Sequence, residues 1–123
     1  MIKELSYEEI EDILKSATSR DPIPVYSDEE RWREIMDNPM LSISFEEYKN
    51  RLDKQMDEPL TLVPASLYLN FLRTGSRSPH DGIISSRRNW LMAFAIGECM
   101  ERKGRFLDAI MDYAWAICEE STW

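Results

Sequence analysis

Two adjacent glutamates near the end of the chain, Glu119 and Glu120, have the residue type that general acid–base chemistry needs, because paired carboxylates can give and take protons. Adjacent residues on a helix point about 100° apart, so the spacing alone does not place both in one site. Charged runs are usually solvated, although acids at a helix C-terminus oppose the helix dipole. We therefore interpret Glu119 and Glu120 as solvated acids at a helix end, and keep two alternatives for Glu119: a functional acid, or an anchor for the following loop.

Two tryptophans flank these acids. An indole ring offers a flat apolar face on which a sugar ring can stack. Trp115 is predicted to share a polar helix face with Asp108 and Asp112, which makes it the better candidate for such a platform. For Trp123 we favour packing beneath a loop over stacking on a sugar.

The remaining reactive side chains are few. Arg77 can hold a carboxylate or sulfate through its bidentate fork, or can pair with Asp81. His80 is the single histidine, and without a positioned partner it is predicted to be a surface residue. Cys99 and Cys118 lie in predicted helices without CxxC spacing, which favours two reduced core thiols. We expect no catalytic residue, no metal site and no cofactor in this chain.

The composition fits one soluble α-helical domain of 123 residues, with 43% hydrophobic and 31% charged side chains. The net charge of -8 arises in the first 60 residues, which hold sixteen acids and eight bases, whereas the remainder holds seven of each. No apolar run is long enough for a membrane span, and the N-terminus lacks the apolar region of a signal peptide. We expect a cytoplasmic protein that binds neither a membrane nor a nucleic acid.

One basic stretch stands out in the neutral half. Four arginines, Arg73, Arg77, Arg87 and Arg88, are opposed in the local sequence only by Asp81. The pattern fits either a solvated loop with helix-end arginines or an edge that meets an anionic ligand.

Helix start signals recur in the first 60 residues. Ser6–Glu9, Ser27–Glu30 and Ser44–Glu47 all have the S-x-x-E pattern of a capping box, in which the serine and the glutamate satisfy each other's backbone amides. Apolar residues follow each box at helical spacing. The segment 1–60 is therefore predicted to form acidic, amphipathic helices.

The second half, 64–123, is richer in apolar residues. Pro64 is predicted in the first turn of a helix that ends at Thr74-Gly75. Glycines and a proline predict an irregular loop over Gly75–Gly82. Two long helices follow, Ser86–Arg102 and Phe106–Glu119, and their three-residue link makes them antiparallel neighbours. The second is predicted to bury the following residues: Leu107, Ile110, Met111, Ala114, Ile117 and Cys118.

Four segments carry a family resemblance: Phe71–Arg77, Arg87-Arg88, Glu98–Asp108 and Trp115–Trp123. Together they resemble the N-terminal helical region of heparinase II/III-like polysaccharide lyases, in which an ICEE-x-TW stretch is often followed by Pro-Ala-His. The resemblance covers residues 64–123 and extends to the first 60 only in their helical character. We therefore expect this chain to be the N-terminal piece of a longer lyase.

The resemblance implies the start of an (α/α) toroid, which in the family is joined to a C-terminal β-sandwich. It also implies β-elimination on a polysaccharide that contains uronic acid. No catalytic residue of the family matches a position here, so the chain alone is expected to be inactive. It would supply scaffold and one wall of the cleft for an acidic polysaccharide, with Arg77, Trp115, Glu119 and Trp123 as the binding residues.

A second hypothesis belongs to another class. The chain would be a self-contained α-helical interaction module without catalytic activity, with its acidic half as the partner-facing surface. Under the lyase hypothesis, the Arg87–Trp123 hairpin lacks its next helical neighbour, so we expect exposed apolar surface there and possible self-association.

Overall fold

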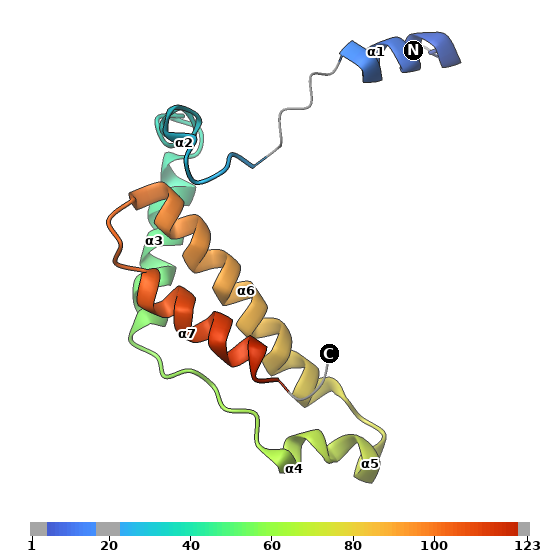
Figure 1. Ribbon diagram of the computed structural model, residues 1–123, viewed down its shortest axis with the longest axis vertical. Coiled ribbons are helices and arrows are strands. Elements are labelled where there is room, and N and C mark those ends of the chain that lie inside the picture. Colours follow the sequence, from blue (N-terminus) through green and yellow to red (C-terminus); the bar gives the residue numbers. More distant parts are fainter. Residues whose placement is uncertain (1–4, 17–22, 121–123) are drawn as a thin grey trace.

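The computed structural model describes residues 5–16 and 23–120, and within these ranges every regular element is a helix (Figure 1). The predicted all-α fold class is therefore confirmed. The helices, in chain order, are α1 Tyr7–Ser16, α2 Glu29–Met36, α3 Ser42–Met56, α4 Ala65–Tyr68, α5 Asn70–Thr74, α6 Ser78–Glu101 and α7 Leu107–Cys118.

Helix α1 begins with the predicted capping box. The Glu9 amide donates to Ser6 Oγ at 3.2 Å, and the Ser6 amide donates to Glu9 Oε2 at 2.9 Å. The helix lies apart from the other helices (Figure 1), and its apolar residues Ile10 and Leu14 are exposed. Ile10 and Leu14 therefore leave much of the apolar face of this amphipathic helix exposed.

The other two predicted helix starts shift. Helix α2 is capped by Asp28, which accepts from the Arg31 amide at 3.2 Å, one residue later than the predicted serine. Helix α3 begins at Ser42, and the capping box predicted at Ser44 is wrong. The Leu41 amide donates to the Asn38 carbonyl. This turn leads directly into α3, which therefore begins two residues before Ser44.

Helix α2 and the segment before it are fastened to the end of α6. The Trp32 indole donates to the Val25 carbonyl at 3.1 Å. Arg102 donates to the Tyr26 carbonyl, and its Nη2 also lies 3.0 Å from Glu29 Oε1. These contacts set the position of α2 across the end of the long helix.

The predicted helix after Pro64 forms as two short helices. Pro64 precedes α4, and a break at Leu69 separates α4 from α5. Gly75 ends α5 with a φ of 75°, a left-handed conformation that glycine adopts without strain, so the predicted helix stop is confirmed.

Helix α6 begins at Ser78, so the irregular loop predicted up to Gly82 is wrong beyond Arg77. Proline is favourable in the first turn of a helix, where its missing amide costs nothing, and Pro79 takes such a position. Gly82 is then a helix-interior glycine, which costs only about 1 kcal/mol relative to alanine. The helix ends as predicted, with Arg102 at a φ of 56° and Gly104 at 74°.

The core lies where α3, α6 and α7 meet. Phe94 and Phe106 are fully buried, and the Phe94 ring lies 5.7 Å from the rings of both Phe106 and Tyr113. Leu52 of α3 fills the remaining side. A Cβ placed on Gly97 would overlap Leu52 Cδ1 and lie 3.1 Å from the Phe106 ring, so α6 approaches its neighbours at this glycine.

The buried face of α7 differs from the predicted one. Tyr113 and Ala116 are buried on the face that continues from Phe106, whereas Leu107 and Met111 are 49% and 59% exposed. Large aromatic side chains contribute the most buried area. Phe106 and Tyr113 are seven residues apart and lie on the same side of the helix, so their burial turns that side toward the core. The apolar surface expected on this hairpin is therefore present along the outer side of α7.

None of the helices in the ranges that the structure covers is long and apolar enough to cross a membrane.

Candidate functional site

A buried cluster of charges lies where the first half of α6 meets the end of α7. Glu120, just after α7, has a side chain that is 2% exposed. Arg88 Nη2 donates to Glu120 Oε2 at 2.8 Å, and Arg87 Nη1 lies 3.5 Å from Glu120 Oε1. The two arginines and one carboxylate join the two helices at this end of the hairpin.

Arg87 also holds two backbone segments. Its Nη2 donates to the Thr61 carbonyl at 2.6 Å and its Nη1 to the Ala116 carbonyl at 3.4 Å. Its Nε and the Oε1 of Glu120 are buried without a hydrogen-bond partner among the described residues. A buried charge is tolerated when it is paired and hydrogen-bonded, so the Arg87 guanidinium and Glu120 depend on each other.

A first cavity of about 520 Å³ lies beside this cluster. Aliphatic side chains of residues 60–65 form much of its wall, and Tyr68, His80, Glu119 and Glu120 supply polar groups. An imidazole, a phenol and two carboxylates around one cavity are groups that can move protons.

His80 is not the surface residue that the sequence predicted. Its side chain is only 13% exposed, its Nδ1 lies 3.2 Å from Asp81 Oδ1, and its ring contacts Tyr68 edge to face at 5.7 Å. The prediction was wrong because it placed His80 in an irregular loop, whereas the residue belongs to the first turn of α6.

A second cavity, of about 490 Å³, lies along the start of α6. Arg87 lines both cavities and therefore stands between them. The second cavity has a larger share of polar side chains, among them Gln55, Ser78, Ser86 and Tyr113, together with the Trp90 ring.

The predicted binding residues are only partly brought together. Glu119 lines the first cavity. Arg77 is exposed just before α6 and pairs with Asp81 at 3.7 Å, which is the second of its two predicted roles. Trp115 is 68% exposed on the outer side of α7, away from both cavities. Trp123 lies outside the described residues.

Sequence reasoning missed the arginine–glutamate cluster. The sequence pattern opposes Arg87 and Arg88 only with Asp81 and predicts a solvated Glu120, but the Glu120 side chain is buried and pairs with both arginines. The partners lie 32 residues apart, and nothing in the local sequence pairs them.

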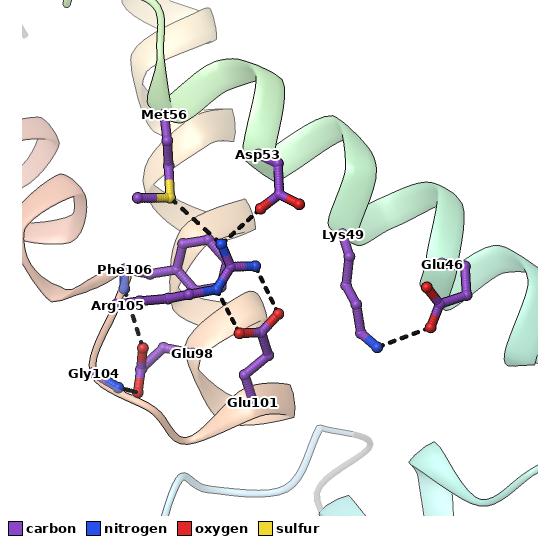
Figure 2. A network of polar contacts seen from close by, with 9 residues as sticks. All are labelled: Glu46, Lys49, Asp53, Met56, Glu98, Glu101, Gly104, Arg105 and Phe106. Atoms are coloured by element: carbon purple, nitrogen blue, oxygen red, sulfur yellow. Dashed lines mark hydrogen bonds and ion pairs between the residues drawn. The ribbon is translucent and has the colours of Figure 1, made fainter.

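A second network holds the link between α6 and α7 (Figure 2). Glu98, 4% exposed, accepts hydrogen bonds from the amides of Gly104 at 2.7 Å and Phe106 at 3.3 Å. These are backbone donors that the start of α7 would otherwise leave unpaired. Glu98 is therefore a structural residue that fixes the hairpin turn.

Arg105 extends this network to α3 (Figure 2). It donates to both carboxylate oxygens of Glu101, at 2.5 and 2.7 Å, and to Asp53 Oδ1 at 2.6 Å. The hydrogen bonds from Arg105 lower the pKa of the Glu101 carboxyl. Much of the family-like segment Glu98–Asp108 thus has a structural explanation.

The two cysteines are free, and they differ in exposure. Burial raises the pKa of the Cys99 thiol. Cys118 is exposed, so the prediction of a core thiol is wrong at this position, because the buried face of α7 is rotated. Within residues 5–16 and 23–120, no three His, Cys, Asp or Glu side chains gather in a way that could hold a metal ion.

No protein-family model matches this chain, and no curated protein matches its sequence.

Proposed function

We propose that this chain is the N-terminal helical part of a heparinase II/III-like polysaccharide lyase and forms the opening hairpins of an (α/α) toroid. The parent protein would cleave a uronic-acid polysaccharide by β-elimination. A base removes the C5 proton, the C4–O bond breaks with protonation of the leaving oxygen, and a C4–C5 double bond forms. The groups for these steps lie outside the present chain.

The α6–α7 hairpin supplies the main support. Two of the four segments that carry the resemblance are joined by the contact of Arg88 with Glu120, and a third, Glu98–Asp108, is held together by the bonds of Glu98 to the amides of Gly104 and Phe106. These three segments all lie on the α6–α7 hairpin, as expected if the motif encodes a hairpin.

The outer side of α7 supports the toroid. Leu107 and Met111, one turn apart, are both about half exposed on a helix that is otherwise rich in apolar residues. Large exposed apolar patches usually mark a surface that another element covers. We assign Leu107 and Met111 to the seat of the next helical hairpin.

The end of the hairpin is our candidate for the cleft wall. Glu119 lines the first cavity there, whereas Trp115 is exposed on the outer side of α7, one turn beyond Met111, and would meet a sugar past the edge of the next hairpin. Arg77 would meet negative charge on the sugar at the cost of its ion pair with Asp81. Trp123 completes the set of proposed binding residues.

Activity measurements test this proposal directly. We expect no unsaturated product, followed by its ultraviolet absorbance, when residues 1–123 are incubated with uronate polysaccharides. The longer protein, whose reading frame would continue into Pro-Ala-His, should form it. Elimination by the 123-residue chain alone would contradict the placement of the catalytic groups.

A substitution in the longer protein tests the cleft wall. Trp115→Ala should lower kcat/KM without changing the circular dichroism, because the exposed ring contributes to sugar binding and little to the core. Asp112→Ala, an exposed position on the same helix, serves as the control and should leave kcat/KM unchanged. An unaltered kcat/KM in folded Trp115→Ala would remove Trp115 from the cleft.

The exposed stripe on α7 also favours the second candidate, a helical interaction module. In that case Leu107 and Met111 would bind a partner protein or a second copy of the chain. A stop codon directly after Trp123, with concentration-dependent dimerisation that Met111→Glu abolishes, would support the module over the lyase.

A further inference from the structure

The second cavity is a trough along one face of α6. Ser78, Gly82, Ser86 and Trp90 line it at intervals of four residues, and residues four apart lie on the same side of a helix. The opposite wall comes from Gln55 and the segment 58–61. The trough is open because the α6 residues that form its floor are small: a Cβ on Gly82 would meet nothing within 4 Å.

A rigid aromatic ring closes one end of the trough. The Arg51 guanidinium lies 4.9 Å from the centre of the Trp90 ring, and the Phe94 ring packs against it at 6.0 Å. The indole is thus held in place from the side of the protein. An indole edge or face that lines an open cavity suits the apolar C–H surface of a pyranose ring.

The polar side chains of the lining are mostly uncharged. Ser78 and Ser86 contribute hydroxyls, and the Gln55 amide nitrogen donates to Tyr113 Oη at 3.0 Å, which fixes the amide group. Gln55 Oε1 has no hydrogen-bond donor among the described residues, so it can accept from a ligand hydroxyl.

The charges at the trough disfavour an anionic ligand. The positive charge of Arg87 is shared with Glu120, 3.5 Å away, and with two backbone carbonyls. The remaining charged residue of the lining is the acidic Glu58. Among the lining residues a carboxylate or sulfate would therefore face the like charge of Glu58, and the Arg51 guanidinium is stacked on the Trp90 ring and is not itself part of the lining.

We propose that this trough binds an uncharged pyranose unit of a saccharide, with the ring against Trp90 and its hydroxyls on Ser86, one turn away, and Gln55. This inference rests on the proposed function only for the identity of the polymer. In a polysaccharide that contains uronate units, the trough binds an uncharged unit of the chain. The acidic unit would then lie outside the trough.

Two neighbouring serines of α6 give a matched test. Ser86 lines the trough and Ser85 does not, yet both are exposed on the same helix. Ser86→Leu fills the trough, whereas Ser85→Leu makes the same chemical change outside it. We expect calorimetric titration with chitobiose to give similar Kd values for the wild type and Ser85→Leu, and a Kd at least tenfold higher for Ser86→Leu.

Further variants keep the test decisive. If Ser86→Leu does not fold, judged by circular dichroism, Gly82→Leu replaces it, because leucine favours a helix more than glycine and would fill the same space. Digalacturonate should bind at least tenfold more weakly than chitobiose, and Glu58→Gln should reduce that difference. Equal binding of the two sugars would overturn the preference for an uncharged unit.

Two results would overturn the site itself: no chitobiose binding to the wild type at millimolar concentrations, or unchanged binding to a folded variant with a filled trough. The lyase proposal has its own measurement. Chitobiose binding without any unsaturated product from the longer protein would refute the lyase and retain the trough.

Discussion

Glu98 offers the sharpest test of how the hairpin is held together. It is 4% exposed and accepts hydrogen bonds from the amides of Gly104 and Phe106. Glu98→Ala removes both acceptors. The Phe106 amide is buried, so its loss costs about 1.5–3 kcal/mol, the range for a hydrogen bond to a charged group. The Gly104 amide can regain water because Gly104 is exposed, which limits its cost to about 1 kcal/mol.

The sum for Glu98→Ala is a loss of about 3 kcal/mol in the free energy of unfolding, reduced by a few tenths because alanine favours a helix. Urea denaturation followed by far-ultraviolet circular dichroism measures it. With an m-value of about 1–3 kcal/mol/M, the midpoint should fall by roughly 1–3 M. Glu98→Gln keeps one acceptor oxygen and should lose about half as much.

Glu47→Ala is the control, since Glu47 is an exposed helical glutamate and its loss should change stability by less than about 0.5 kcal/mol. A Glu98→Ala variant within 1 kcal/mol of the wild type, measured at an unchanged m-value, would refute our account of the hairpin turn, which predicts roughly three times that loss.

The remaining predictions concern titration and reactivity. Arg105 lowers the pKa of Glu101 in the folded state, so this pair stabilises the protein at neutral pH and ceases to do so as the pH falls through that lowered pKa. Arg105→Gln should cost about 1 kcal/mol at pH 7, and the difference in denaturation midpoint should vanish in acid. Cys118 should react with a thiol reagent well before Cys99, because the Cys99 thiol is partly buried and has a raised pKa. Mass spectrometry of the singly labelled protein would show the order of reaction, and equal rates at the two cysteines would contradict it.

Local signals predicted the helices well because they act between residues three or four apart. The capping box at Ser6, the stop at Gly75 and the link after α6 all depend on such contacts, and all three are confirmed. The sequence does not predict the start of α6, because Pro79 and Gly82 are typical of loops, although proline is also suited to a first helical turn.

The local sequence pattern could not predict contacts between segments that lie far apart in the chain. Which face of α7 is buried depends on the aromatic residues that contact Phe94 of α6. The sequence of α7 has apolar residues on two faces and does not show which of the two is buried. The candidate site shows the same limit. Glu119 was identified by type and does line a cavity, but the burial of Glu120 requires Arg88, 32 residues away.

The close approach at Gly97 has a consequence for the history of this sequence. Because a Cβ there would overlap Leu52 Cδ1 and lie 3.1 Å from the Phe106 ring, a side chain at position 97 requires the buried Leu52 to move or to be replaced by a smaller residue. In relatives of this chain, a side chain at position 97 should appear only with a smaller residue at 52, or after it. Replacing a helix-interior glycine usually stabilises the helix. Here, a replacement of Gly97 is favourable only together with a second change at position 52.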